Sequence, residues 1–180
     1  VWRDDGPAGP GMCQAWIEED PSAGVVDLLP IHEEHPGWRS VLEGQAGDGA
    51  PIRLVHADVR AVQEIALLDS ITNNSDRKGG HLLVDTSGHV WGIDHGLTFH
   101  EEDKLRSVLW GWAGEPIPDD LVETLSRLRA MLESDEAERV TGWLTTAECR
   151  ALLARIDWLI ANGVFPLPSE QWPSIPWPVF

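Results

Sequence analysis

Two carboxylates that follow separate predicted elements carry the chemistry that this sequence can offer. Asp76 lies in a polar loop over residues 69–81, and Asp94 follows a pair of predicted strands. Phosphoryl transfer needs one carboxylate to orient a hydroxyl nucleophile, a second to hold Mg²⁺ against a polyphosphate, and a cation to neutralise the transferred group. Lys78 supplies a cation two residues after Asp76. The residue types and their order therefore indicate a phosphotransferase site.

A helix and a hairpin must position the two carboxylates. Apolar residues recur every three or four positions from residue 59 to residue 68, which predicts an amphipathic helix that ends within residues 69–74. Two β-prone runs, residues 82–85 and 89–93, are separated by three turn-forming residues and predict a hairpin. Because the helix and the hairpin deliver their carboxylates to the same end, we expect the carboxylates to converge.

The flanking sequence predicts a mainly helical body. Residues 119–132 and 145–160 have the helical period, and the second run begins with a Ser/Thr-x-x-Glu capping box. Residues 12–17 alternate in the manner of a short strand, whereas residues 24–49 mix apolar pieces with Pro and Gly and predict short helices and loops. Residues 165–180 hold five Pro and two Trp and predict an extended tail that lies on the domain.

Composition limits the class of protein. A chain of 180 residues fits one compact domain, and its net charge of -17 argues against binding to nucleic acid or to an anionic membrane surface. The sequence has no apolar run of the roughly 20 residues that span a bilayer and no signal-peptide pattern, so we expect a cytoplasmic protein without membrane insertion. Cys13 and Cys149 have no metal-like spacing and are expected to be reduced, buried thiols.

Three segments of the chain resemble a known family. The pattern Asp-x-Ile-x-x-Asn-x-Asp-Arg at residues 69–77, then a hairpin, then Ile-Asp-x-Gly-Leu-x-Phe at residues 93–99, resembles the catalytic and metal-binding loops of phosphatidylinositol 3- and 4-kinases. The resemblance is closest to type II phosphatidylinositol 4-kinases and extends to uncharacterised actinobacterial proteins. Residues 11–18 are similar to the hinge strand of that family. The resemblance covers residues 9–110.

The resemblance implies an ATP-dependent and Mg²⁺-dependent kinase, with Mn²⁺ as an alternative metal. Asp76 would be the catalytic aspartate. Lys78 or Arg77 would stabilise charge on the transferred phosphoryl group. Asp94 would be the metal-binding aspartate.

The second metal ligand departs from the family pattern. A kinase catalytic loop has Asn five residues after its Asp, and here that position is His81. Imidazole is a softer ligand than the oxygen donors that Mg²⁺ prefers. Either Asn73 or Asn74 would then compensate, or a single metal would bind.

The resemblance also implies the domain organisation. The hinge, around Trp16, Ile17 and Glu18, would hold adenine by its backbone. The glycine-rich loop and the ATP-binding lysine of the family belong to an N-terminal lobe, which would lie upstream of Val1. The expected α+β fold therefore comprises the end of the N-lobe with the hinge strand over residues 1–20, a kinase-like C-lobe over residues 21–164, and the tail over residues 165–180.

Three alternatives remain open. The first is a pseudokinase that serves as a nucleotide-binding or protein-interaction module, because His81 replaces Asn. The second is a metal-dependent hydrolase built on Asp76, Asp94 and His81. The third is a zinc site, for which the candidate ligands are His81, His89, His95, His100, Asp85 and Asp94.

The acceptor is not specified by any motif. The acidic run over residues 101–103 and the net charge of -17 disfavour an anionic lipid. The charge is more consistent with a small-molecule or protein acceptor, such as a cationic molecule, a neutral alcohol or a basic protein.

Overall fold

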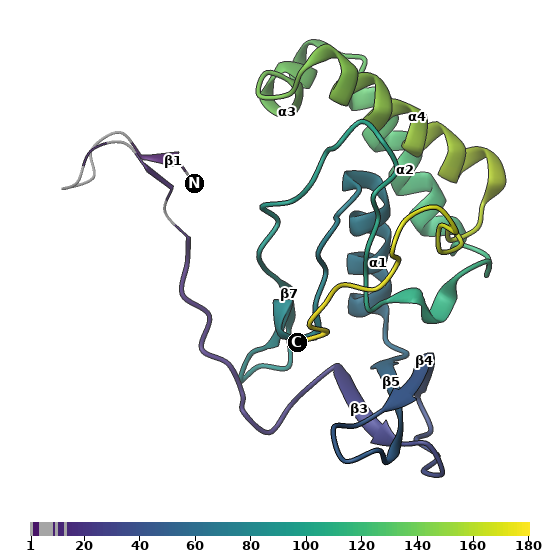
Figure 1. The fold of residues 1–180 in the computed structure, drawn as a ribbon. Coiled ribbons are helices and arrows are strands. Elements are labelled where there is room, and N and C mark those ends of the chain that lie inside the picture. Colours follow the sequence, from purple (N-terminus) through teal and green to yellow (C-terminus); the bar gives the residue numbers. More distant parts are fainter. Residues whose placement is uncertain (1, 4–8, 10, 13) are drawn as a thin grey trace.

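The computed structural model describes residues 2–3, 9, 11–12 and 14–180, which form helices and short antiparallel sheets (Figure 1). This mixture confirms the α+β class predicted from the sequence. The strands are β1 (Trp2–Arg3), β2 (Gly11–Met12), β3 (Val26–Pro30), β4 (Trp38–Gln45), β5 (Pro51–Ala57), β6 (Leu82–Val84) and β7 (Val90–Gly92). The helices are α1 (Arg60–Thr72), α2 (Asp119–Met131), α3 (Glu138–Thr141) and α4 (Thr146–Asn162), with 3-10 turns at Gly79–His81, Trp110–Trp112 and Asp135–Ala137.

Helix α1 lies between the β3–β5–β4 sheet and the pair of helices α2 and α4 (Figure 1). Val62 and Ile65 are among the residues of its buried face. The helix ends because Asn73 adopts a left-handed backbone, with φ of 55°, and donates its N–H to the carbonyl of Asp69. The helix predicted from the apolar period is therefore confirmed, and its left-handed end delivers the polar loop that carries Asp76.

The three-stranded sheet, in the order β3–β5–β4, occupies most of residues 24–57. The prediction of short helices and loops for residues 24–49 is therefore wrong where β3 and β4 form, whereas residues 31–37 and 46–49 are loops and turns. Strand β5 is central and antiparallel to both neighbours, and its last four residues are buried. Strands β3 and β4 are largely exposed or half-buried, so their sequences lack the apolar alternation that signals a strand. Their pairing with β5 stabilises them instead.

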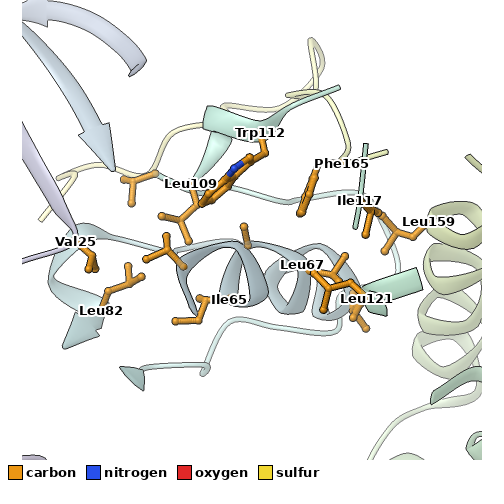
Figure 2. Close-up of a cluster of buried hydrophobic side chains, with 14 of the residues drawn as sticks. Val25, Ile65, Leu67, Leu82, Leu109, Trp112, Ile117, Leu121, Leu159 and Phe165 are labelled. Carbon is orange, nitrogen blue, oxygen red and sulfur yellow. The ribbon is translucent and has the colours of Figure 1, made fainter. Parts of the chain in front are cut away.

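Helices α2 and α4 close the other side of the core, and both confirm the sequence prediction. Both hydrogen bonds of the capping box form between Thr145 and Glu148, and Gly163 ends α4 with a left-handed backbone. Apolar side chains from α1, α2, α4 and the connecting segments form one core, part of which Figure 2 shows along α1. No described helix is both long enough and apolar enough to cross a membrane.

The tail over residues 165–180 lies on the domain, as predicted. Phe165 and Pro176 are buried. The carbonyl of Ser174 accepts hydrogen bonds from the backbone N–H of Ser107 and from the indole of Trp110, both at 2.9 Å.

The strand predicted over residues 12–17 is absent where residues 14–17 are described. Strand β2 ends at Met12 and pairs with β1. Residue 13 lies outside the described residues, and so does the predicted Cys13 thiol. Cys149 is a free thiol, and it is half-buried rather than buried.

His56 joins the sheet to the segment that precedes α2. Its ring is fully buried in β5, where Nδ1 donates to the carbonyl of Ala57 at 3.1 Å and Nε2 accepts the backbone N–H of Gly111 at 3.0 Å. The acceptor role of Nε2 needs the neutral imidazole, because both ring nitrogens are donors once the ring is protonated. Burial lowers the pKa of His56 from 6.5 to about 4.

We therefore expect His56 to make folding stability depend on pH. The pKa of His56 is lower in the folded protein than in the unfolded chain. His56 therefore makes its full contribution to folding stability above pH 6.5, and this contribution is lost as the pH falls toward 4. The full effect is about 3 kcal/mol. Urea unfolding between pH 4 and 7.5 checks it, with His56→Gln as the comparison. An equally steep pH dependence in the variant would contradict this assignment.

Candidate active site

Two loops meet at the end of α1. The α1–β6 loop, residues 73–81, lies against the post-hairpin segment, residues 93–107, through backbone hydrogen bonds. Ser75 donates its N–H to the carbonyl of Leu97 at 2.9 Å. Arg106 donates to the carbonyl of Asn74 and accepts from Arg77, both at 3.0 Å. The loops that carry Asp76 and Asp94 are thus held side by side, and the expected convergence of the two carboxylates themselves stays a prediction.

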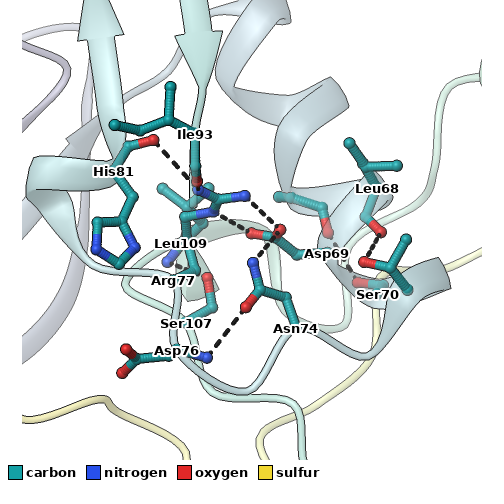
Figure 3. A network of polar contacts seen from close by, with 12 residues as sticks. Leu68, Asp69, Ser70, Asn74, Asp76, Arg77, His81, Ile93, Ser107 and Leu109 are labelled. Atoms are coloured by element: carbon teal, nitrogen blue, oxygen red, sulfur yellow. Dashed lines mark hydrogen bonds and ion pairs between the residues drawn. The ribbon is translucent and has the colours of Figure 1, made fainter. Parts of the chain in front are cut away.

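Arg77 is the centre of a buried polar network (Figure 3). Its guanidinium is completely buried and makes a two-point ion pair with Asp69, at 2.8 and 2.9 Å. Its Nη1 also donates to the carbonyls of His81 and Ile93, at 3.2 and 2.8 Å. One side chain therefore ties the end of α1 to the residue before β6 and to the residue before Asp94.

Asn74 lies in the same network and is also fully buried. Its Nδ2 donates to Asp69 Oδ1 at 3.0 Å, and its Oδ1 accepts the backbone N–H of Asp76 at 3.1 Å. Both ends of the amide are therefore used, and one of them orients the backbone at Asp76.

Asn73 holds the post-hairpin segment. Its Nδ2 donates to the carbonyls of His100 and Glu102, and its Oδ1 accepts the backbone N–H of Lys104 at 3.0 Å. These contacts fix the acidic run beside the end of α1.

Asp76 and Lys78 form a partly accessible pair. Lys78 Nζ lies 3.0 Å from Asp76 Oδ2, and the two side chains are 21% and 24% exposed. A carboxylate in this position can accept a proton from a bound hydroxyl group, and the neighbouring ammonium can stabilise a phosphoryl group.

His81 and Asp94 form the second pair. His81 Nε2 lies 3.5 Å from Asp94 Oδ2, and the Asp94 side chain is 63% exposed. Asp94 has a left-handed backbone with φ of 53°, which a short polar residue tolerates better than most. Among the described residues, no group of three or more His, Cys, Asp and Glu side chains lies close enough to hold a metal. A cation here would take two protein donors, with phosphate oxygens or water completing its shell.

The hinge residues lie apart from these contacts. The Trp16 side chain is 91% exposed, and Glu18 is exposed. The chain then runs beside the hairpin, where Asp20 donates its N–H to the carbonyl of Val84 at 2.8 Å. No described contact joins Trp16, Ile17 or Glu18 to Asp76 or Asp94.

Two features of the site were not predicted from the sequence. Asp69 belongs to the motif at residues 69–77, but the sequence does not single it out as the partner of Arg77. The second feature is the tail: Gly79 donates its N–H to the carbonyl of Val179 at 2.7 Å, and a Cβ on Gly79 would lie 2.5 Å from the ring of Phe180. The absence of a side chain at Gly79 therefore leaves the space that the Phe180 ring occupies against the α1–β6 loop.

A cavity of about 790 Å³ lies elsewhere, among α4, the post-hairpin segment and residues 164–167. It is lined mainly by apolar side chains, including Trp158 and Phe165. Neither Asp76 nor Asp94 lines it. The Asp76 and Asp94 pairs therefore lie outside this cavity, although Asn73 and part of the acidic run contribute to its lining.

A sequence profile of phosphatidylinositol 3- and 4-kinases matches residues 43–157, which include α1, both loops and the hairpin. The chain belongs to the phosphatidylinositol 3- and 4-kinase family. This confirms the resemblance at the level of the superfamily, and it indicates a kinase-like phosphotransferase. The match contains Asp76, Lys78, His81 and Asp94 but not the predicted hinge over residues 16–18.

One curated relative of this kinase-family chain is Protein Rv2133c of Mycobacterium tuberculosis. The two are 43% identical over 185 residues. The alignment covers 98% of this chain and 66% of the relative, so the chain spans slightly less than two thirds of that protein's length. No solved structure matches the chain.

Proposed function

We propose that the chain is the catalytic part of an ATP-dependent and divalent-metal-dependent phosphotransferase that acts on a hydroxyl acceptor. The observation that carries this proposal is the buried ion pair of Arg77 and Asp69. It holds together the two loops that bear Asp76 and Asp94, inside the region that matches the kinase family.

In the proposed reaction, Asp76 accepts the proton of the acceptor hydroxyl. The hydroxyl oxygen then forms a bond to the γ-phosphorus of ATP while the bond to the β,γ-bridging oxygen breaks and ADP leaves. Lys78, beside Asp76, stabilises charge on the transferred group. Arg77 is a positioning residue in this proposal, because its buried guanidinium is fully engaged with Asp69 and backbone carbonyls.

The residues present fit a divalent cation. Asp94 supplies an accessible carboxylate and His81 supplies a nitrogen 3.5 Å away. When bound, the cation neutralises charge on the polyphosphate. Asn74 supports the site by orienting the Asp76 backbone. The adenine contacts proposed at Trp16, Ile17 and Glu18 rest on the resemblance of residues 11–18 alone.

The proposed acceptor is a small molecule or a protein rather than an anionic lipid. Glu101, Glu102 and Asp103 are exposed on the post-hairpin segment, where they would repel an anionic membrane surface. The net charge of -17 acts in the same direction.

Calorimetric ATP binding tests this function, on the complete protein with any residues encoded upstream of Val1. We expect binding that requires a divalent cation and is lost in Asp94→Ala. Asp27→Ala, which removes an exposed carboxylate on β3, is the matched control and should bind normally. Absence of ATP binding in the wild type would contradict the proposal and favour an interaction scaffold.

A pseudokinase is the second candidate, because His81 stands where the kinase pattern has Asn. It predicts ATP binding without transfer to any acceptor. Hydrolysis of ATP that no acceptor accelerates would instead favour the metal-dependent hydrolase.

A further inference from the structure

The two side chains at the proposed metal position offer different donor atoms. Asp94 offers a carboxylate oxygen, whereas His81 offers the imidazole nitrogen Nε2, 3.5 Å from it. Donors that lie about 2.0–2.2 Å from a shared cation are separated by about 3–3.5 Å. The observed separation is therefore compatible with one cation bound to both side chains.

The backbones of both donors are fixed before any cation binds. Arg77 Nη1 donates to the carbonyl of His81 and to the carbonyl of Ile93, which precedes Asp94. Ile93 also donates its own N–H to the carbonyl of His81 at 2.9 Å. The His81 side chain is only 15% exposed. This packing limits the movement of His81 and favours retention of its nitrogen as a ligand.

We propose that this position selects a first-row transition-metal cation over Mg²⁺, and that His81 Nε2 is the selecting ligand. The proposal rests on the phosphotransferase function and adds the identity of its metal. Mg²⁺ is a hard cation that binds oxygen donors and is reluctant to exchange water for nitrogen. Imidazole binds first-row transition metals, with affinity that rises from Mn²⁺ through Co²⁺.

The second nitrogen of the ring does not fix the tautomer of His81. His81 Nδ1 is buried and has no hydrogen-bond partner. A metal on Nε2 requires the tautomer with the proton on Nδ1. Without a metal, the contact with Asp94 would instead need the proton on Nε2, so the two states differ in which ring nitrogen carries the proton, while Nε2 faces Asp94 in both.

Electron paramagnetic resonance of bound Mn²⁺ tests the proposal on the complete protein. The probe is Mn²⁺ with inorganic tripolyphosphate, which offers oxygen donors and no nitrogen. We expect ¹⁴N coupling in the wild type, loss of that coupling in His81→Asn, and unchanged coupling in His89→Asn, the control on the exposed hairpin turn. Absence of ¹⁴N coupling in the wild type would by itself overturn the proposal, whatever the variants show.

Competition calorimetry supplies the second readout. We expect the wild type to bind Mn²⁺ about tenfold or more tightly than Mg²⁺, and Co²⁺ more tightly than Mn²⁺. His81→Asn should bring the Mn²⁺ and Mg²⁺ affinities close together. Equal affinities in the wild type, together with metal-dependent ATP binding, would overturn the selectivity and leave the phosphotransferase proposal intact. A preference for Mn²⁺ without ATP binding would support the metal position and contradict the phosphotransferase.

Discussion

Asp76→Asn should lower the rate of phosphoryl transfer by about 10²–10⁴-fold, because Asn has nearly the shape of Asp and cannot accept the hydroxyl proton. ATP binding should change little, since Asp76 is not among the proposed metal or adenine contacts. The fold should also persist, because the only described side-chain partner of the Asp76 carboxylate is Lys78, in a partly exposed pair. Initial rates at saturating ATP measure the effect on kcat.

The control for this experiment is Asp27→Asn, on the exposed face of β3, which should transfer phosphate at the wild-type rate. Circular dichroism of both variants separates lost chemistry from lost folding. A folded Asp76→Asn protein with a wild-type kcat would place the general base elsewhere and refute the assigned role of Asp76.

Local sequence signals were sufficient for most of the helical structure. The capping box of Thr145 and Glu148 and the glycine at 163 mark both ends of α4 by contacts within a few residues. The hairpin is equally local, because β6 and β7 pair across a short turn. Such elements depend little on the rest of the fold, which explains why their sequences predict them.

The β3–β5–β4 sheet depends on contacts that are remote in sequence. Arg39 on β4 donates to the carbonyl of Gly111 at 2.9 Å and makes an ion pair with Asp58. Buried His56 accepts from the same Gly111. The two contacts with Gly111 join residues more than 50 positions apart. The local sequence of residues 24–49 does not indicate these long-range contacts, and the exposed strands lack the apolar alternation that would predict them.

The candidate site was predictable in outline but not in its internal roles. The order of helix, loop and hairpin predicted that the Asp76 and Asp94 carboxylates converge, and the structure joins the two loops that carry them. The sequence could not separate Arg77 from Lys78, since both are cations beside Asp76 in a polar loop. Burial separates them, because the left-handed residue Asn73 turns the chain back so that Arg77 points at Asp69.

The ion pair of Arg77 and Asp69 leads to the largest expected loss of stability. Arg77→Ala should lower the free energy of unfolding by about 3–5 kcal/mol, because it leaves the buried Asp69 carboxylate without its cation. It also removes the donor to the carbonyls of His81 and Ile93. Urea unfolding measures the loss. Arg60→Ala, which breaks exposed pairs with Glu64 and Asp120, is the control and should change stability little.

A double variant distinguishes stabilisation by the ion pair from positioning of the loops. Asp69→Leu with Arg77→Met replaces both charges by apolar groups, so it should be more stable than Arg77→Ala, in which one buried charge is unpaired. If Arg77 positions the loops that carry Asp76 and Asp94, this folded double variant should still have a much lower kcat than the wild type. Recovery of both stability and kcat would show that the ion pair only stabilises the fold, and would contradict a positioning role for Arg77.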